Sequence, residues 1–244
     1  MMGFLIRHIS RFALLILLFL TSLAAQWQPG PDSKRIKFSG YEWIVKDSAE
    51  RRVGPGSNYF SDDAVRVEAD GLKLRVFEKD GRFYCAEVVS VASLGYGTYR
   101  FHVASNVDGL APNIVLGLFT WSDDPGEEGS HKELDVELGR WGKTDNDIAQ
   151  FVVQPYTRPE NIIRFPLPAD ASSSVHSFTW MPHQAHFTSE VRGAVVQDHV
   201  FTRRVPAPDK ENIRLNLWIT GGRMPAAGVL EVMIRSFEFL PQPK

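Results

Sequence analysis

The stretch at residues 133–138 reads Glu-Leu-Asp-Val-Glu-Leu and alternates carboxylates with aliphatic side chains. A period of two is typical of a β-strand, whose successive side chains point to opposite faces. We therefore expect Glu133, Asp135 and Glu137 to share one face while the aliphatic residues between them pack into a core. Like charges on one face of a strand repel one another and do not help folding, which points to a role in chemistry.

Three interpretations of this stretch have to be weighed. Two glutamates with an aspartate between them match the carboxylate pair that cleaves glycosidic bonds. Alternation also describes any half-buried strand with a wet face, although such faces usually mix Lys, Thr and Glu. Carboxylate oxygens are the ligands that calcium prefers, so a calcium site in a structural sandwich is a further alternative. The neighbouring sequence has to decide between them.

Residues 1–25 have the anatomy of a secretory signal peptide. Cationic residues precede an apolar run over 12–20, and small residues suited to cleavage follow at 22–25. The apolar run is shorter than the roughly 20 residues that cross a bilayer, so an uncleaved anchor is the weaker alternative. We expect a secreted protein, extracellular or periplasmic, with no membrane association after cleavage.

The remaining residues, 26–244, are expected to form one domain and a monomer. All-β sandwiches of about 200 to 250 residues are commonly single units, and neither a linker nor a repeat divides this stretch. A net charge of −2 argues against a nucleic-acid partner, which requires a basic face. Cys85 is the one cysteine, so the fold has to be held by its core.

Strands separated by turns dominate the pattern after the leader. Asp70-Gly71 and Asp80-Gly81 are the turn dipeptides of two predicted hairpins. Residues 114–121 are almost wholly apolar, as expected of a strand that is covered on both faces. Further strands are predicted at 98–103, 148–156, 175–181, 184–192, 195–202, 213–219 and 229–239. Without a convincing helical period, the pattern predicts an all-β, two-sheet antiparallel β-sandwich of jelly-roll type.

Four blocks of the chain resemble the glycoside hydrolase family 16 enzymes, the laminarinase and lichenase group with a concanavalin-like jelly roll. The likeness runs from about Tyr41 to the C-terminus. The blocks are 83–87 with 95–99, 133–137, 176–180, and 205–208 with 216–218. The second block matches the catalytic pentapeptide of the family.

The resemblance implies that Glu133 is the nucleophile, that Asp135 assists it and that Glu137 is the acid/base. No cofactor is required by this chemistry, although a structural calcium ion stays open. Retaining hydrolysis needs two carboxyl groups about 5 to 5.5 Å apart. The Cα atoms of residues 133 and 137 lie about 13 Å apart in an extended strand, so only long side chains on a concave sheet can meet. We also expect the negative charges of Glu133 and Asp135 to raise the pKa of Glu137.

A glycan cleft needs flat aromatic side chains next to amides and acids, because sugar rings have apolar faces and hydroxyl edges. A single Trp is nevertheless more often part of a core than of such a platform. Positions that match the family, or lie close to the acids in sequence, are the candidate substrate-binding residues. They are Asn58, Glu87, Trp121, His131, Trp141, Gln150, Gln154, Asn216 and Trp218.

The chain also departs from the family pattern. His131 stands where the family usually has Trp, the pairing Cys is missing, and Val88, Val89 and Val152 replace polar residues. Cys85 should therefore stay free. Because valine cannot supply the hydrogen bonds of those polar residues, low activity on mixed-linkage lichenan is expected. The resemblance implies a secreted, retaining, endo-acting glycoside hydrolase whose partner is a polysaccharide, with a β-glucan as the expected substrate and a non-catalytic glycan-binding module as the runner-up.

Overall fold

The computed structural model describes residues 26–242 except 223–224, 226–227 and 229. The leader predicted at residues 1–25 lies outside the described part of the chain. Within the described ranges the regular elements are β-strands and short 3₁₀ turns, and no helix is long and apolar enough to span a membrane. The prediction of an all-β fold is confirmed.

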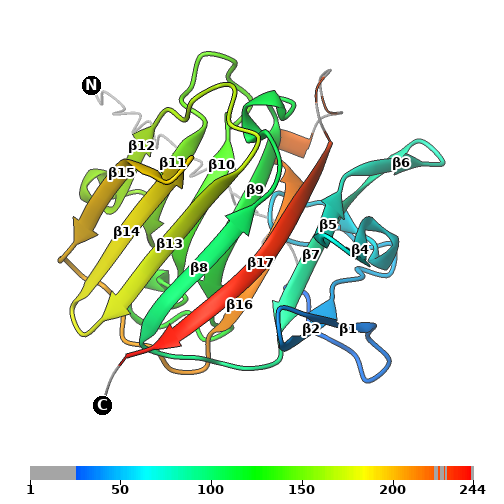
Figure 1. The fold of residues 1–244 in the computed structure, drawn as a ribbon. Coiled ribbons are helices and arrows are strands. Elements are labelled where there is room, and N and C mark those ends of the chain that lie inside the picture. Colours follow the sequence, from blue (N-terminus) through cyan, green and yellow to red (C-terminus); the bar gives the residue numbers. More distant parts are fainter. Residues whose placement is uncertain (1–25, 223–224, 226–227, 229, 243–244) are drawn as a thin grey trace, which may run out of the picture.

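Two sheets face each other, with the smaller one in front of the larger one in Figure 1. The larger sheet has the order β1 (Arg35–Phe38), β2 (Tyr41–Val45), β7 (Arg82–Ser90), β16 (Asn212–Ile219), β9 (Ile114–Trp121), β10 (Leu134–Gly139), β11 (Ala149–Val153) and β12 (Ile162–Phe165), and β3 (Tyr59–Phe60) and β6 (Phe77–Lys79) pair with β7. The smaller sheet has the order β15 (Ala194–Phe201), β14 (Gln184–Val191), β13 (Ser174–Met181), β8 (Gly97–Val103), β17 (Glu231–Pro241), β5 (Gly71–Arg75) and β4 (Val65–Glu68). All pairs are antiparallel except β3 with β7.

The two hairpins predicted from Asp-Gly dipeptides are both present. Glu68 is paired with Gly71 in the β4–β5 hairpin, and Lys79 is paired with Arg82 in the β6–β7 hairpin. Gly71 has a φ of 149° and passes so close to β17 that a Cβ atom there would lie 2.3 Å from the carbonyl oxygen of Ile234. Glycine is therefore required at this turn both for its conformation and for its size.

The predicted strand at 114–121 is β9, and all but its last residue are buried. The strand predicted at 148–156 ends earlier, at Val153, because Pro155 cannot donate to a sheet ladder. The edge strands β1 and β12 and the neighbouring β2 were not predicted. Their short, partly charged sequences carry little alternation, and edge strands are commonly short and charged.

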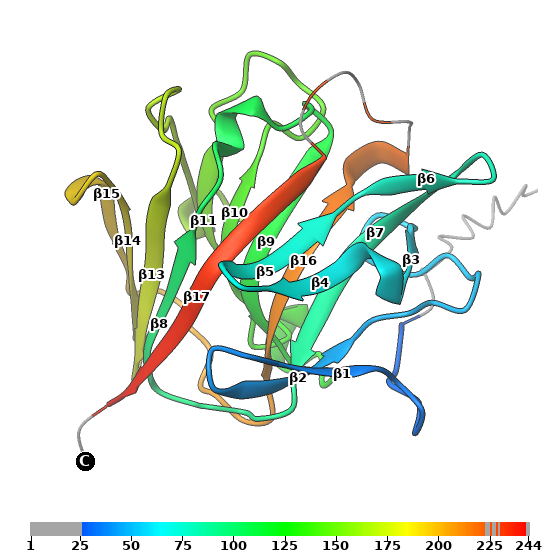
Figure 2. The same ribbon diagram turned by 45° about the vertical axis from the view of Figure 1, so that its right-hand side comes forward.

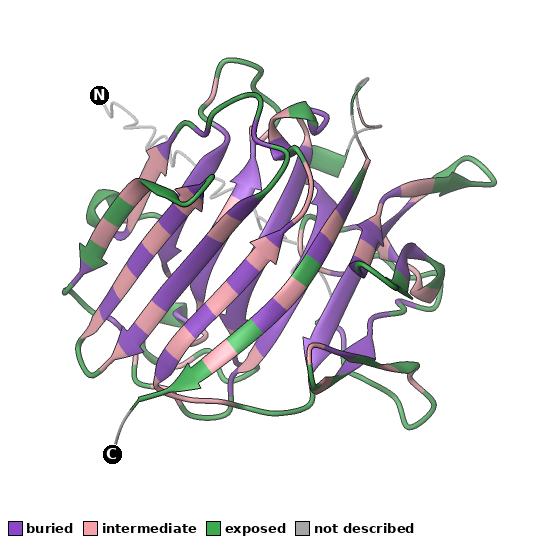
Figure 3. Ribbon diagram, in the orientation of Figure 1, coloured by how far each residue is buried: buried purple, intermediate pink, exposed green. Residues whose placement is uncertain are grey.

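The core lies between the sheets, and Figure 3 shows buried and less buried residues alternating along the strands of the front sheet. Leu134, Val136 and Leu138 of β10 have no exposed surface. Trp180 of β13 is also fully buried. Cys85 is buried and free, as predicted. Figure 2, turned by 45°, shows the strands of the smaller sheet still lying across β9, β10 and β16. The opposite face of the larger sheet is left to form a site.

Candidate active site

The carboxylates of β10 lie on the face of the strand that points away from the core. Glu133, immediately before the strand, lines a cavity of about 310 Å³ together with Asp135 and Glu137. Asp135 is 2% exposed, and the two glutamates are half-buried. The face of the strand is therefore the one that the alternation predicts.

The other walls of the cavity come from neighbouring strands and from the start of the described chain. They combine aromatic rings, amides and charged groups: Gln26, Trp27, Lys46, Gly54, Pro55, Glu87, Gly117, Phe119, Trp121, His131, Arg214, Asn216 and Trp218. Such a mixture of apolar surface and a few placed polar groups is typical of a ligand site.

Gly117 of β9 makes room at the centre of the cavity. It is paired with Glu137 on one side and with Asn216 on the other. Its N–H donates to Oδ1 of Asn216 at 3.1 Å, and a Cβ atom at position 117 would lie 2.5 Å from that oxygen. A side chain at this position would displace the amide of Asn216 from beside the acids.

Gln150 of β11 and Gln154, the residue that follows β11, donate hydrogen bonds to two of the carboxyl groups. Nε2 of Gln154 donates to Oδ2 of Asp135 at 3.0 Å, and Nε2 of Gln150 donates to Oε2 of Glu137. Oε1 of Gln150 in turn accepts from Nε of Arg164 at 3.0 Å. Gln150 and Gln154 were predicted to bind substrate. In the structure both hydrogen-bond to the acids, and neither is among the residues that line this cavity.

Burial raises the pKa of all three carboxyl groups, because a charge is poorly solvated there. The pKa of Glu137 is raised to about 8 by burial first and by the Asp135 carboxyl second. Burial also raises the pKa of Glu133 to about 8, against the opposing effects of a hydrogen bond from Asp135 and the charge of Arg214. The pKa of Asp135 lies well above its ordinary value, through burial and its contact with Glu133. The expected effect of Asp135 on the pKa of Glu137 is present but comes second to burial, and Glu133 is not among the causes of that shift.

The pKa shifts of Glu133 and Asp135 are those of a hydrogen-bonded pair of carboxyl groups. Asp135 keeps its proton and donates it in this hydrogen bond to Glu133. Both glutamates have a pKa of about 8, and they differ in their partners: Glu133 accepts from Asp135 and lies near the charge of Arg214, whereas Glu137 accepts from Gln150. Within the described residues, no group of His, Cys, Asp and Glu is arranged to hold a metal ion.

Charged groups that sequence reasoning missed surround Glu87, which is 1% exposed. The ammonium of Lys46 lies 3.0 Å from Oε2 of Glu87 and donates to the carbonyl of Gly54 at 2.7 Å. Nη1 of Arg214 lies 3.4 Å from Oε1 of Glu87. Arg214 alternates with Asn216 along β16, so its place on the cavity face could have been found from that period.

Trp121 and Trp218 line the cavity, whereas Trp141 is not among its lining residues. The ring of His131 stacks on Trp121 with centroids 4.0 Å apart and an interplanar angle of 10°. Nδ1 of His131 is 2.9 Å from the carbonyl of Ser122, which makes it the protonated ring nitrogen. Trp141 meets Trp218 edge to face at 5.5 Å, so its contact with the site is indirect.

Asn58 lies outside the residues that line the cavity, although it was predicted to bind substrate. Its Nδ2 donates to the carbonyls of Pro55 and Ile219, both at 2.9 Å. These bonds hold the 54–56 loop against Trp218, where a Cβ atom on Gly56 would lie 2.7 Å from the indole ring. Asn58 acts on the cavity through this loop.

Val88, Val89 and Val152, the valines that replace polar residues of the family pattern, do not all face the same side of the sheet. Val88 is fully buried and alternates with Glu87 along β7, so it faces the core between the sheets and the prediction that it replaces a polar group in the cleft is wrong. Val89 is paired with Arg214, and Val152 is paired with Asp135. These two share the cavity-facing side of their strands with Glu87 and with the glutamines of β11, because alternate residues face the same way.

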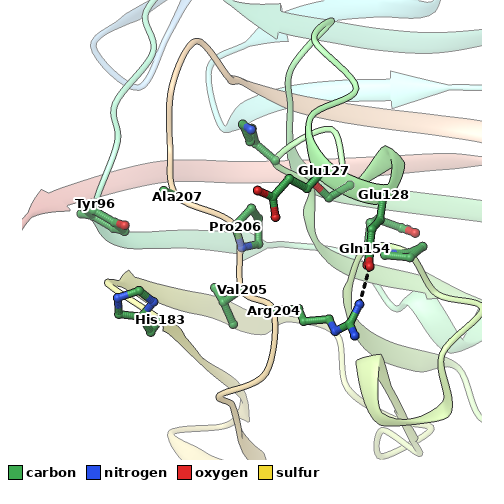
Figure 4. A pocket seen from close by; sticks show the side chains of 12 residues that line it. Tyr96, Glu127, Glu128, Gln154, His183, Arg204, Val205, Pro206 and Ala207 are labelled. Carbon is green, nitrogen blue, oxygen red and sulfur yellow. Dashed lines mark hydrogen bonds and ion pairs between the residues drawn. The ribbon is translucent and has the colours of Figure 1, made fainter.

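A second cavity of about 580 Å³ is lined in part by the loop that precedes β10 (Figure 4). Glu127, Glu128, Lys132 and Arg204 are among the residues that line it, and Arg204 is paired with Glu128. Gln154 also lines this cavity while it donates to Asp135, so one side chain connects the two spaces.

No family model and no curated protein matches this sequence. Several solved structures are similar to it, however. The Bacillus licheniformis β-glucanase is 21% identical with a TM-score of 0.64, over 86% of this chain and 98% of that one. A Bacteroides ovatus GH16 enzyme from a mixed-linkage glucan utilisation locus, in complex with its product, is 13% identical with a TM-score of 0.58, over 81% and 94%.

A third similar structure comes from Mycobacterium tuberculosis and is described as an immunostimulatory antigen and pseudo β-1,3-glucanase. It is 20% identical with a TM-score of 0.60, over 82% of this chain and 91% of that one. At these identities the likeness establishes the fold. The jelly roll of glycoside hydrolase family 16 enzymes, which the sequence blocks implied, is confirmed.

Proposed function

We propose that this protein is a secreted glycoside hydrolase that cleaves internal β-linked bonds of a polysaccharide, a β-glucan, with retention of configuration. The observation that carries the proposal is the arrangement on β10. Asp135 is hydrogen-bonded to Glu133. Glu137 lies on the same face of the strand and accepts a hydrogen bond from a different residue, Gln150. Two carboxyl groups in different environments are what glycoside hydrolysis requires.

In the first step Glu133 attacks the anomeric carbon of the bound sugar. The hydrogen bond from Asp135 and the nearby charge of Arg214 favour the ionised form of Glu133. Glu137, with its raised pKa, gives its proton to the leaving oxygen as the glycosidic bond breaks. A covalent glycosyl-enzyme and a free alcohol result.

In the second step Glu137, now ionised, takes a proton from a water molecule that attacks the same anomeric carbon. The bond to Glu133 breaks, its carboxylate is released, and the product keeps the configuration of the substrate. The proton on Glu137 is thereby restored. Every proton is accounted for by the two glutamates, while Asp135 stays protonated throughout.

The β-glucan assignment is supported by the cavity and by the structural neighbours. Trp121 and Trp218 offer apolar surface for sugar rings, and Asn216 and Glu87 offer hydrogen bonds to hydroxyl groups. The neighbours from B. licheniformis and B. ovatus are glucanases. A glycan-binding protein without turnover is the second candidate, since a neighbour of the same fold is described as a pseudo β-1,3-glucanase.

The test is to incubate the protein with β-glucans, agarose, carrageenan and xyloglucan and to size the products. We expect shorter products from a β-glucan, and NMR of fresh product should show the anomer of the substrate bond. Glu133→Gln should abolish turnover while oligosaccharide binding persists. Inverted product would refute Glu133 as nucleophile, and binding without turnover in the parent protein would favour the second candidate.

A further inference from the structure

The first residues of the described chain cross the proposed active-site cavity. We call Gln26–Gln28 the N-terminal strap. Nε2 atoms of Gln26 and Gln28 donate to Oδ1 and Oδ2 of Asp123, the latter at 3.0 Å. Nε1 of Trp27 donates to the carbonyl of Asp47 at 2.7 Å. The strap is therefore fixed at two points that are remote from it in sequence.

The two anchors lie on opposite sides of the strands that carry the polar groups of the cavity. Asp47 follows β2 and Asp123 follows β9, and the sheet order between them is β2–β7–β16–β9. A segment held at both anchors has to cross β7 and β16, which carry Glu87 and Arg214. Gln26 and Trp27 line the cavity accordingly.

Trp27 forms a wall and not a stacking platform. Its side chain is buried, with 7% of the residue exposed, and its N–H is already paired. The ammonium of Lys46 lies 5.8 Å from the ring centroid, which adds a cation–π contact on the protein side. The cavity of about 310 Å³ is at the small end of the range of about 300 to 1,000 Å³ for ligand pockets.

Asp123 connects the strap to Arg214. Its Oδ1 lies 3.4 Å from Nη2 of Arg214 and accepts from Nε1 of Trp121 at 3.3 Å. The side chain of Arg214 is 10% exposed, and its guanidinium lies 5.7 Å from the centroid of the Trp121 ring. The strap, the carboxylate of Asp123 and the guanidinium of Arg214 are thus connected by hydrogen bonds and ion pairs and form one side of the cavity.

Arg214 has donors to spare. Both of its ionic contacts are long, at 3.4 Å, and Nε is buried without a hydrogen-bond partner in the described part of the chain. A guanidinium has five N–H donors, and leaving a buried one unpaired costs free energy. Arg214 lines the cavity, where a sugar hydroxyl could accept from the Nη groups, whose present contacts are long. Val89 is paired with Arg214 across β7 and β16 and has no polar group with which to occupy these donors.

We infer that the N-terminal strap closes one side of the substrate cleft and that Arg214, held by Asp123 and Glu87, binds a hydroxyl of the sugar next to that closed side. The ligand is a β-linked glucan chain, of which only a short segment fits between the carboxylates and the strap. This inference rests on the proposed function, because it concerns the substrate of the same site.

The first test measures how affinity depends on chain length. Isothermal titration with β-glucan oligosaccharides of increasing length, in a Glu133→Gln background, should show a Kd that stops improving at a short length. Gln26→Ala with Gln28→Ala loosens the strap and should let Kd keep falling with length. Gln197→Ala, on the surface strand β15, is the matched control and should behave as the parent. Identical length dependence in all three would overturn the inference.

A second pair of variants covers the case in which the loosened strap impairs folding. Asp123→Asn keeps the size of the anchor and removes its charge, and it should also relax the length limit. Arg214→Met should weaken binding of the shortest oligosaccharide about ten- to hundredfold, as removal of a hydrogen bond to a charged group does. Unchanged affinity in Arg214→Met would overturn its role, provided the melting temperature shows a folded protein.

Product analysis separates this inference from the proposed function. With the active protein, the loosened strap should release longer products from a β-glucan than the parent does. Hydrolysis with an unchanged product ladder contradicts the strap alone. Length-limited binding without any hydrolysis contradicts the proposed function alone. If no oligosaccharide binds to the parent protein, both are wrong.

Discussion

Arg214 lies directly across from Val89 in the register of β16 and β7, and its guanidinium contacts Glu87 from that position. The resemblance to glycoside hydrolase family 16 implies a polar residue at position 89, on β7. In this protein a guanidinium reaches the same area from the next strand. Because Arg214 also contacts Asp123, it is tied to the N-terminal strap as well as to the sheet. Its charge is among the influences that lower the pKa of Glu133.

Arg214→Met should move the acidic limb of the pH–activity profile to higher pH. Removing the positive charge lets the pKa of Glu133 rise further, so a higher pH is needed to ionise the nucleophile. Arg164→Met is the matched control, because the charge of Arg164 lowers the pKa of Glu137. That variant should instead move the basic limb of the profile to higher pH. Profiles of kcat/KM against pH for both variants check this, and a shift of the same limb in both would contradict the assigned roles.

Substitution of the two glutamates by alanine should have different chemical consequences. Glu137→Ala removes proton donation and should lower kcat/KM on natural substrates by about 10²- to 10⁴-fold, the usual contribution of a general acid. Substrates with good leaving groups should still react, and azide should restore turnover with retained configuration. Glu133→Ala with azide should give the inverted product. NMR of the glycosyl azides distinguishes the two, and the same anomer from both variants would contradict the division of roles.

Stability should fall as the pH rises from about 4.5 to about 8. The pKa of Glu133 and of Glu137 is raised to about 8 in the folded protein, from an ordinary value of 4.5. The folded state therefore binds more protons than the unfolded state in this interval, and the free energy of unfolding decreases with pH there. Glu133→Gln should flatten this dependence and keep or raise the melting temperature near pH 8. Melting curves at several pH values measure the effect.

The same melts test the calcium alternative. A cation bound by the three carboxylates would stabilise the fold by mass action, so a chelator would lower the melting temperature of the parent protein. We expect no effect of chelator on the parent. A chelator-sensitive parent together with a destabilised, chelator-insensitive Glu133→Gln variant would contradict the catalytic interpretation of this strand.

Export should produce a mature chain that starts near Ala25 or Gln26. The charged start and short apolar run at residues 1–25 predict cleavage at that point. Mass spectrometry of the protein from its native host identifies the first residue. A protein that begins at residue 1 and sediments with membranes would show that the segment is an anchor.

Local patterns in the sequence were sufficient for much of the fold. The Asp-Gly turns, the apolar strand at 114–121 and the face of Glu133 each depend on residues close together in the chain. The period of two also placed the acids of β10 on one side, because the aliphatic residues between them leave no alternative.

Contacts between remote segments could not be predicted in this way. Arg214 and Lys46 meet at Glu87 only because β2, β7 and β16 are neighbours in the sheet. Val88 was assigned to the cleft from a family position, although alternation with Glu87 places it in the core. The expectation of low lichenan activity therefore rests on Val152, the one of the three valines that faces the cleft without a guanidinium opposite it.

The alternation on β10 also determines what a folding error would do. Strand pairing has a period of two, so a slip of one residue against β9 and β11 would turn Asp135 and Glu137 into the core and Leu134, Val136 and Leu138 toward water. Burying unpaired carboxylates is prohibitively unfavourable. A misaligned chain would therefore not persist as a folded but inactive protein, and the fraction of molecules that fold should equal the fraction with correctly placed acids.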